Sequence, residues 1–594
     1  MKSRTGGCFN GREFLTKQGS TEDVFTPEDF NEEHRMIAET AQRFVDQKLL
    51  PLTERIEKLD LKLIIELLRT AGELGLLGVD VPQKYGGLGF DKLSSLIISE
   101  KISQMASFAV SYGAHSGIGT LPIVYFGSEE QKHKYLPKLV KGELFSAYAL
   151  TESGAGSDAL SSKTKAVLSP DKKNWMLSGE KIWVTNAGFA DLFIVFAKID
   201  GIDFSAFIVE RNFSGVYLNS EEKKMGIRGS STRSLTLRNV PVPIANLLGE
   251  QGKGRKIALN TLNIGRLKLG VGCVGAAKKS IDESIQYALD RHQFGQPISE
   301  FGAIREKLAA MAIRIWVAET ISYRTVGMID KELQEAHGND PLVAVKAIEK
   351  YAIECSIVKV WCAEMVDFVV DEAVQIYGGN GYIQGCPAER HYRDSRINRI
   401  YEGTNEINRL LISGRLLRHI IKSEFPLETD TKQISAKFTK FPQQLECGNE
   451  LSEESLIVEN TKKATFLIVN LALQKHGKKL VMQQEILMSL ADMIMETYAL
   501  ESSIIRGLKI AGSSTHNFKL IKKVIRLYAH DSIDKIRLSG RKILGVVVQG
   551  NDLEFYASNF EELCAHKLIP SISIRRQVAR ALLDAGGYKA LATT

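Results

Sequence analysis

The spacing of apolar residues changes twice along this chain, and these changes constrain the possible folds more than any single motif does. Up to about residue 143, apolar residues recur every three or four positions, which predicts helices. Between about 144 and 250, short runs of β-branched and aromatic residues alternate with turn residues, which predicts strands. Helical spacing then returns. Because 594 residues are too many for one core, we expect a multidomain α+β fold.

The same pattern suggests where the domains begin and end. We expect a polar N-terminal tail (1–25), an N-terminal helical domain (26–143), a middle β-barrel or sandwich domain (144–250), a helical bundle domain (251–420) and an extra C-terminal helical domain (421–594). The β runs are 145–150, 163–168, 175–177, 182–185, 192–197, 206–210, 216–219 and 235–242.

One glycine pattern could be mistaken for a nucleotide-binding loop. Residues 270–275 read GVGCVG, which matches the G-x-G-x-x-G of dinucleotide-binding folds. That motif needs a strand directly before it and a helix that opens within it. Here it lies in the middle of a helix-period segment, 256–292. We therefore interpret these glycines as small residues at a helix crossing and reject a Rossmann fold.

Charge and cysteine content exclude several classes of function. The chain has 77 basic and 70 acidic residues, and a net charge of +7 gives no argument for nucleic-acid binding. None of the seven cysteines forms a C-x-x-C pair, and no His/Cys cluster has metal-site spacing, so we predict no metal. Reduced thiols are the cytosolic default, and no apolar run could span a bilayer. We expect a cytoplasmic protein.

The segment 517–542 is rich in lysine and arginine. A helix face in contact with solvent is the simpler interpretation of these charges. Peripheral association with an anionic membrane surface through this segment is the alternative, and the sequence leaves it open.

The strongest candidate for chemistry is a single carboxylate, Glu402, which lies between Tyr401 and Gly403. A carboxylate against an aromatic wall loses hydration, which raises its pKa toward values that suit a general base. The glycine allows a ligand to approach the backbone closely. A surface acid at the start of a helix is the simpler interpretation of the same residues, so motifs elsewhere in the chain must decide.

Five stretches together resemble the acyl-CoA dehydrogenase family, in order and at the expected separations, within residues 26–420. They are 147–158 (AYALTESGAGSD), 181–186 (KIWVTN), 290–295 (DRHQFG), 375–382 (QIYGGNGY) and 401–404 (YEGT). Two departures, Ser153 for a frequent proline and Glu406 for a frequent glutamine, remove no required group. With its long C-terminal extension, the chain looks most like the very-long-chain subgroup and its bacterial relatives.

The resemblance implies FAD as the cofactor. Leu150 and Thr151 would hydrogen-bond the flavin ring, and Trp183 would cover one of its faces. Arg291 and Phe294 would hold the pyrophosphate and adenine across a dimer interface, since a guanidinium donates two parallel bonds to phosphate. The full set of implied cofactor contacts is Tyr148, Leu150, Thr151, Ser157, Trp183, Thr185, Arg291, Phe294, Gln375, Gly379, Thr404 and Glu406.

The resemblance also implies the reaction. Glu402 would take the α-proton of an acyl-CoA while the β-hydride passes to the flavin, giving a trans-2-enoyl-CoA. The backbone N–H of Glu402 would hold the thioester carbonyl, where enolate charge develops. One branch of the family has its base at the position of Gly265, which has no side chain here, so Glu402 is favoured. The implied substrate contacts are Ser157, Asn263, Arg266 and Gly403.

Small residues at Gly113, Ala114 and Gly265 predict a deep site and a long-chain fatty acyl-CoA substrate. The resemblance further implies a role in fatty-acid β-oxidation, electron transfer to electron-transfer flavoprotein, and a homodimer in which the C-terminal extension replaces the second dimer of a tetramer. Two alternatives stay open. One is an acyl-CoA oxidase-like flavoenzyme that uses oxygen, and the other is a family member kept as an assembly scaffold.

Overall fold

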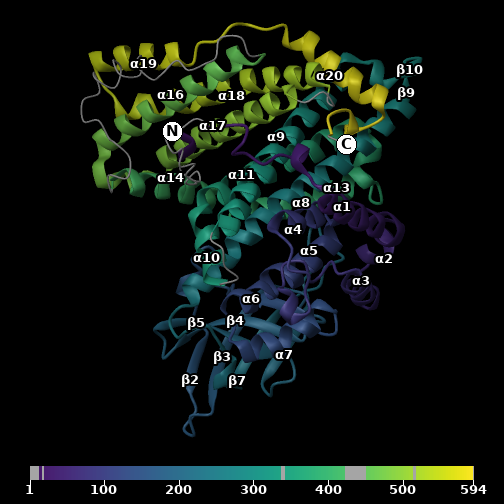
Figure 1. The fold of residues 1–594 in the computed structure, drawn as a ribbon, viewed down its shortest axis with the longest axis vertical. Coiled ribbons are helices and arrows are strands. Elements are labelled where there is room, and N and C mark those ends of the chain that lie inside the picture. Colours follow the sequence, from purple (N-terminus) through teal and green to yellow (C-terminus); the bar gives the residue numbers. More distant parts are fainter. Residues whose placement is uncertain (1–12, 16–18, 336–340, 422–449, 513–516, 593–594) are drawn as a thin grey trace, which may run out of the picture.

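The protein is described by a computed structural model that covers residues 13–15, 19–335, 341–421, 450–512 and 517–592. A β domain lies at one end of the molecule, and the C-terminal helices α16 to α20 lie at the other (Figure 1). Between them lies a bundle built around α8 (Gly254–Asp290). The predicted α+β class, with helical domains before and after a β domain, is confirmed.

The N-terminal domain is helical. Asn31 caps α1, because its side chain accepts a hydrogen bond from the His34 N–H at 2.8 Å. A π-helical segment, η6 (Ala114–Gly119), follows α5 and interrupts the regular helix where small residues cluster. The helices are α1 (Glu32–Phe44), α2 (Thr53–Glu57), α3 (Leu61–Glu73), α4 (Lys92–Ile102), α5 (Ala106–Gly113), α6 (Leu121–Phe126) and α7 (Glu129–Val140).

The segment before α1 differs from the loose tail that its composition predicts. Phe14 and Leu15 are buried, and the Phe14 ring packs edge-on against Tyr498 with ring centroids 4.9 Å apart. This contact ties the start of the described chain to the C-terminal domain. Residues 1–12 and 16–18 lie outside the described residues.

The β domain is one sheet with the strand order β6-β7-β3-β2-β4-β5-β8, and β1 pairs in parallel with β4. The two runs predicted at 175–177 and 182–185 form a single strand, β3, because bulges interrupt its pairing with β7 without ending it. The strands are β1 (Ser146–Ala149), β2 (Lys165–Leu168), β3 (Asn174–Thr185), β4 (Leu192–Ile199), β5 (Asp203–Glu210), β6 (Val216–Glu221), β7 (Thr232–Pro243) and β8 (Leu247–Leu248).

The bundle confirms the interpretation of the glycine pattern. A Cβ on Gly275 would lie 1.8 Å from the carbonyl oxygen of Glu100 in α4, so α8 and α4 approach as closely as glycine permits. The other helices are α9 (Gly302–Glu335), α10 (Pro341–Lys350), α11 (Ala352–Tyr377), α12 (Gly379–Tyr382), α13 (Pro387–Ser395) and α14 (Asn405–Ile421). A small hairpin, β9 (His292–Gln293) and β10 (Gln296–Pro297), follows α8.

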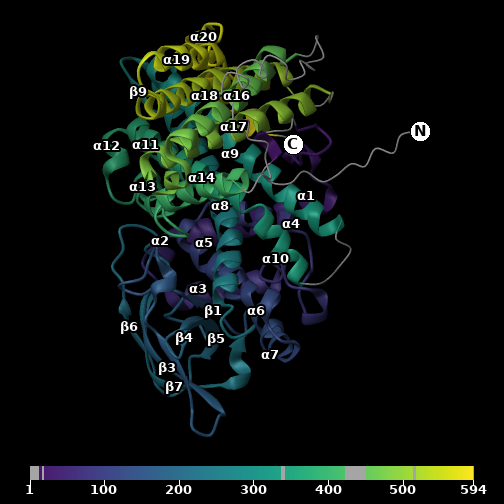
Figure 2. The same ribbon diagram turned by 90° about the vertical axis from the view of Figure 1, so that its left-hand side faces the viewer.

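The C-terminal helices form a layer on the bundle (Figure 2), where α17 packs on α9 and α14. Two buried ion pairs join the layer to α9: Arg324 with Glu501 and Arg506 with Glu319, each at 2.7 Å. The helices are α16 (Ser452–His476), α17 (Gln484–Ala511), α18 (Phe518–Val547), α19 (Asn551–Leu563) and α20 (Ser571–Ala585).

Many of the basic side chains in and beside 517–542 are engaged within the protein. Lys522, Arg526, Lys535, Arg537 and Arg541 each form an ion pair with an acidic side chain. These pairs reduce the positive charge that could attract an anionic surface, and membrane contact stays a prediction. Across the described ranges, no helix has both the length and the apolar character needed to cross a membrane.

Candidate active site

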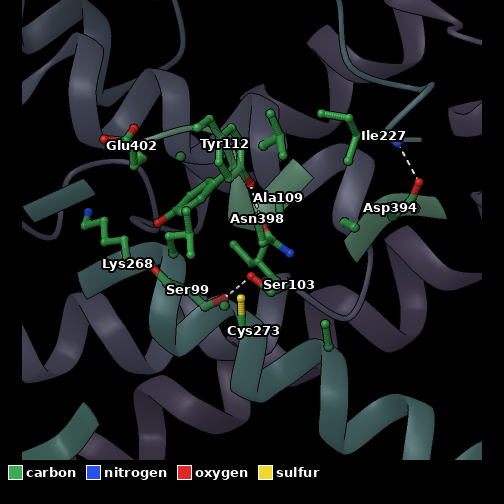
Figure 3. A pocket seen from close by; sticks show the side chains of 18 of the residues that line it. Ser99, Ser103, Ala109, Tyr112, Ile227, Lys268, Cys273, Asp394, Asn398 and Glu402 are labelled. Atoms are coloured by element: carbon green, nitrogen blue, oxygen red, sulfur yellow. Dashed lines mark hydrogen bonds between the residues drawn. The ribbon is translucent and has the colours of Figure 1, made fainter. Parts of the chain in front are cut away.

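A cavity opens between the N-terminal domain and the bundle (Figure 3). Its walls come from α4, α5 and η6 on one side, and from α8, α13 and residues 398–402 on the other. A Cβ on Gly113 would meet no atom within 4 Å, so this wall leaves open space. The small residues that line this wall are Ala106, Ala109, Gly113, Ala114 and Gly117.

The Glu402 carboxylate lies at the wall of this cavity (Figure 3). Its Oε2 atom is buried, and no group in the described part of the chain forms a hydrogen bond with it. Burial raises the pKa of Glu402 from 4.5 to about 7, although the positive charges of Arg266 and Lys359 oppose that rise. A carboxylate that ionises near neutral pH and lacks a partner is suited to accept a proton from a ligand.

Gly265 has no side chain that could act as a base, and the absence of a side chain also leaves room for Glu402. A Cβ at this position would lie 2.8 Å from Oε2 and 3.0 Å from Cδ of Glu402. Because real Cβ contacts are essentially never shorter than 3.0 Å, any other residue at this position would displace the carboxylate. The glycine on α8 therefore makes room for the base on the loop before α14.

The backbone around Glu402 is strained and tightly held. Glu402 and Gly403 have φ values of +58° and +81°, and a residue with a side chain rarely adopts the first. Arg266 Nε donates to the Glu402 carbonyl at 3.1 Å, and Lys359 Nζ donates to the Gly403 carbonyl at 2.8 Å. The Asn408 side-chain amide donates to the Gly403 carbonyl at 2.8 Å and the Thr404 carbonyl at 3.1 Å.

The Glu402 N–H, in contrast, has no acceptor among the described residues. A backbone donor beside an unpaired carboxylate can bind a ligand carbonyl next to the atom that loses a proton. Burial raises the pKa of Tyr148, and the negative charge of Glu402 adds to that rise. The two groups therefore lie close enough to interact. The buried Tyr148 hydroxyl also has no partner in the described part of the protein.

Trp183 and Thr185 lie at the end of β3, beside the second bulge. Trp183 has φ +56° and its side chain is 63% exposed, so the bulge turns an aromatic ring out of the sheet. Thr185 lines the cavity. Lys181, fully buried, donates to the Leu150 carbonyl at 3.1 Å and pairs with Glu152 at 2.7 Å. It thus fixes the 150–152 stretch beside the exposed ring.

The predicted phosphate-binding turn is open. A Cβ on Gly154 or Gly156 would meet no atom within 4 Å, and Ser157 is exposed. Thr151 is half-buried, and its carbonyl accepts a hydrogen bond from the Ile182 N–H at 2.9 Å. An exposed aromatic ring and an open glycine turn therefore lie on neighbouring segments of the chain, because Thr151, which precedes the turn, is hydrogen-bonded to Ile182 next to Trp183.

The remaining predicted residues fall into two groups. Asn263 and Arg266 are buried beside the base, where the Asn263 side-chain oxygen accepts a bond from Arg266 at 2.9 Å. Thr404 and Glu406 follow the base, and the Thr404 hydroxyl accepts a bond from the Ile407 N–H at 3.3 Å.

Arg291 and Phe294, in contrast, lie beyond the end of α8, near the exposed Gln375 and Gly379. Arg291 lies 26 residues beyond Gly265 in sequence, which corresponds to about 39 Å along an α-helix. One chain therefore does not bring Arg291 to the base, whereas it does bring Thr185 to the cavity that Glu402 lines.

Comparison with known proteins agrees with this architecture. Models of the acyl-CoA dehydrogenase N-terminal, middle and C-terminal domains match residues 31–143, 147–240 and 252–417, and a further acyl-CoA dehydrogenase C-terminal model matches 460–560. A probable acyl-CoA dehydrogenase of Bacillus subtilis is 44% identical over 99% of this chain and 100% of its own length.

A mouse very long-chain specific mitochondrial acyl-CoA dehydrogenase is 32% identical over 84% of this chain and 77% of its own length. Among solved structures, an acyl-CoA dehydrogenase of Bacillus anthracis complexed with FAD has a TM-score of 0.94. It is 46% identical and covers 98% of this chain and 100% of its own. This protein belongs to the acyl-CoA dehydrogenase family, and the resemblance inferred from the five motifs is confirmed.

Sequence reasoning missed Lys359 and Asn408, which hold the turn of the base. A signal for Lys359 was available, because it lies within the apolar run Ile357-Val358-Lys359-Val360-Trp361. A lone cation in an apolar helix needs a buried partner. Asn408, four residues after Thr404, gave no such signal.

Proposed function

We propose that this protein is an FAD-dependent acyl-CoA dehydrogenase that converts a long-chain fatty acyl-CoA into its trans-2-enoyl-CoA. The observation that supports this best is the Glu402 carboxyl group, whose pKa is raised to about 7. Among the described residues, neither its Oε2 atom nor the backbone N–H of Glu402 has a hydrogen-bond partner. Three features of the described residues are compatible with FAD: the exposed Trp183 ring, the open turn at Gly154 and the buried Tyr148 hydroxyl, which has no hydrogen-bond partner among those residues.

In this mechanism the chain binds, orients and moves a proton. The Glu402 N–H holds the thioester carbonyl, which makes the α-proton more acidic because enolate charge develops beside a fixed donor. The Glu402 carboxylate then takes that proton. When bound, FAD supplies the acceptor for the hydride that leaves the β-carbon. The small residues of α5 and η6 leave space in the cavity for the acyl chain.

The long-chain preference is supported by the extent of the cavity along α8. Gly265, Leu269, Gly272 and Ala276 all line it, and Ala276 is 11 residues beyond Gly265. That separation corresponds to about 16 Å of helix. At roughly 1.2 Å per bond of an extended chain, it accommodates about thirteen bonds. Each buried CH₂ contributes about 0.8 kcal/mol, so occupation of this length would select long chains.

We also propose a homodimer and electron transfer to electron-transfer flavoprotein. The position of Arg291 supports the dimer, since this residue can serve a cofactor near Glu402 only if it belongs to a second copy. Phe294 is 92% exposed and has φ +53°, which fits a side chain that a partner covers. The electron acceptor rests on the family resemblance, and reduction of purified electron-transfer flavoprotein would test it directly.

The test is an anaerobic visible spectrum of the holoenzyme during addition of butyryl-, octanoyl-, lauroyl- or palmitoyl-CoA. We expect the flavin band to bleach, and to bleach fastest with the long chains. Glu402→Gln should retain the flavin without bleaching, whereas Asp371→Asn, an exposed acid on α11, should behave as wild type. Normal bleaching in Glu402→Gln would refute the base assignment. Oxygen consumption equal to turnover in air would point to an oxidase instead.

A further inference from the structure

Lys359 is a buried cation in direct contact with the backbone of the turn that carries Glu402, residues 402–405. Its side chain is fully buried in α11, and Nζ donates to the Gly403 carbonyl at 2.8 Å and to Asn405 Oδ1 at 2.7 Å. Burial of an ammonium group is costly unless hydrogen bonds compensate it. Both compensating oxygens belong to the segment that directly follows Glu402, so the position of Lys359 and the shape of that segment depend on each other.

The turn needs such support because its backbone is strained. Glu402 keeps its left-handed conformation only if surrounding contacts impose it. Arg266 and Lys359 anchor successive carbonyls, those of Glu402 and Gly403, from α8 and α11 respectively. If the Lys359 contact were lost, the turn could relax toward the right-handed region. Such a change would swing both the carboxylate and the N–H of Glu402 away from their present directions.

We propose that Lys359 is a positioning residue for α-proton removal: it holds the Glu402–Asn405 turn so that the carboxylate and the N–H of Glu402 both serve the same ligand, and its charge favours the ionised carboxylate. This inference rests on the proposed function and deepens it. Lys359 touches the turn through its bonds to Gly403 and Asn405, and its contribution to the reaction passes through Glu402.

Electrostatics around the two groups agree with this role. Burial lowers the pKa of Lys359 to about 8, while the charge of Glu402 raises it. In the other direction, Lys359 lowers the pKa of Glu402, which burial has raised to about 7. The other titratable groups that act on Lys359 are Cys273 of α8, Arg266 of α8 and Glu364 of α11. Removal of the lysine charge therefore leaves Glu402 harder to ionise.

The test isolates proton removal from hydride transfer. A 3-thia-acyl-CoA, in which sulfur replaces the β-carbon, has a removable α-proton but cannot release a β-hydride. We would measure loss of α-deuterium from this analogue in the holoenzyme by mass spectrometry, across pH 5 to 10. The variants are Lys359→Met, which removes both donor and charge, and Lys359→Gln, which keeps a donor without charge.

We expect Lys359→Met to exchange about tenfold more slowly than wild type at pH 7 or below, with the midpoint of the exchange profile shifted to higher pH. Lys359→Gln should show the same shift and recover part of the rate at high pH. Lys278→Met serves as the matched control, because Lys278 is a half-buried lysine paired with two acids, Glu100 and Glu319, and does not line the cavity. It should lower the thermal unfolding midpoint and leave the exchange profile unchanged.

Exchange within twofold of wild type in Lys359→Met, with an unmoved midpoint, would overturn the proposal. An equal shift in Lys278→Met would also overturn it, because the effect would then be general destabilisation. If Lys359→Met does not fold, the midpoint in Lys359→Gln decides alone. Absence of exchange in wild type would instead refute the proposed function, and the two failures are thereby distinguishable.

Discussion

Substitution of Gly265 by alanine should separate activity from stability. The added Cβ would lie 2.8 Å from Glu402 Oε2, and ordinary contacts begin near 3.4 Å, so the carboxylate must move by about 0.6 Å. A displacement of 1 Å at a reacting group costs about a hundredfold in rate, so we expect kcat to fall about tenfold or more. Alanine in a helix interior gains about 1 kcal/mol over glycine. A strained Glu402 rotamer offsets about the same amount.

Gly265→Ala should therefore unfold within about 1 kcal/mol of wild type while turning over much more slowly. The assay is flavin bleaching under single-turnover conditions, together with urea unfolding of the same preparation. Gly545→Ala is the matched control, since a Cβ on this glycine of α18 meets nothing within 4 Å. It should keep wild-type kcat. A kcat for Gly265→Ala within twofold of wild type would show that the carboxylate position seen here is not the reactive one.

Three further results are expected. Gly113→Leu fills open space in the cavity and should lower kcat/KM for palmitoyl-CoA by roughly fourfold per excluded methylene, with little effect on butyryl-CoA; equal losses would contradict a role in chain length. Glu501→Gln leaves Arg324 buried without its counter-charge and should cost about 3 kcal/mol or more in urea unfolding. An unchanged midpoint would show that the pair contributes nothing. The pKa of the Glu402 carboxyl is raised from 4.5 in the unfolded chain to about 7 in the folded protein. Between these two pH values the folded protein holds a proton that the unfolded chain has lost, so the free energy of unfolding falls as pH rises from about 4.5 to about 7. Glu402→Gln should therefore be more stable than wild type by about 3 kcal/mol at pH 8 and equal to it near pH 4; the same difference at both pH values would refute the raised pKa.

The order of helical and β domains was predictable, because the period of apolar residues follows directly from backbone geometry. The crossing glycines in α8 were also predictable, since no strand precedes them. The strand that carries Trp183 was predicted as two separate runs. Bulges depend on pairing with β7, a strand that begins more than 45 residues later, and local sequence does not report them.

The sequence by itself determined the fold class, the family and the candidate base, because each is encoded in residues close together in the chain or in their periodic spacing. Only the tertiary structure decided how that base is tuned. The carboxylate of Glu402 is enclosed by Gly265 of α8, and its turn is held by Lys359, which lies 44 residues before Gly403 in α11. Burial and hydrogen bonding are properties of groups brought together by folding, and no local pattern contains them.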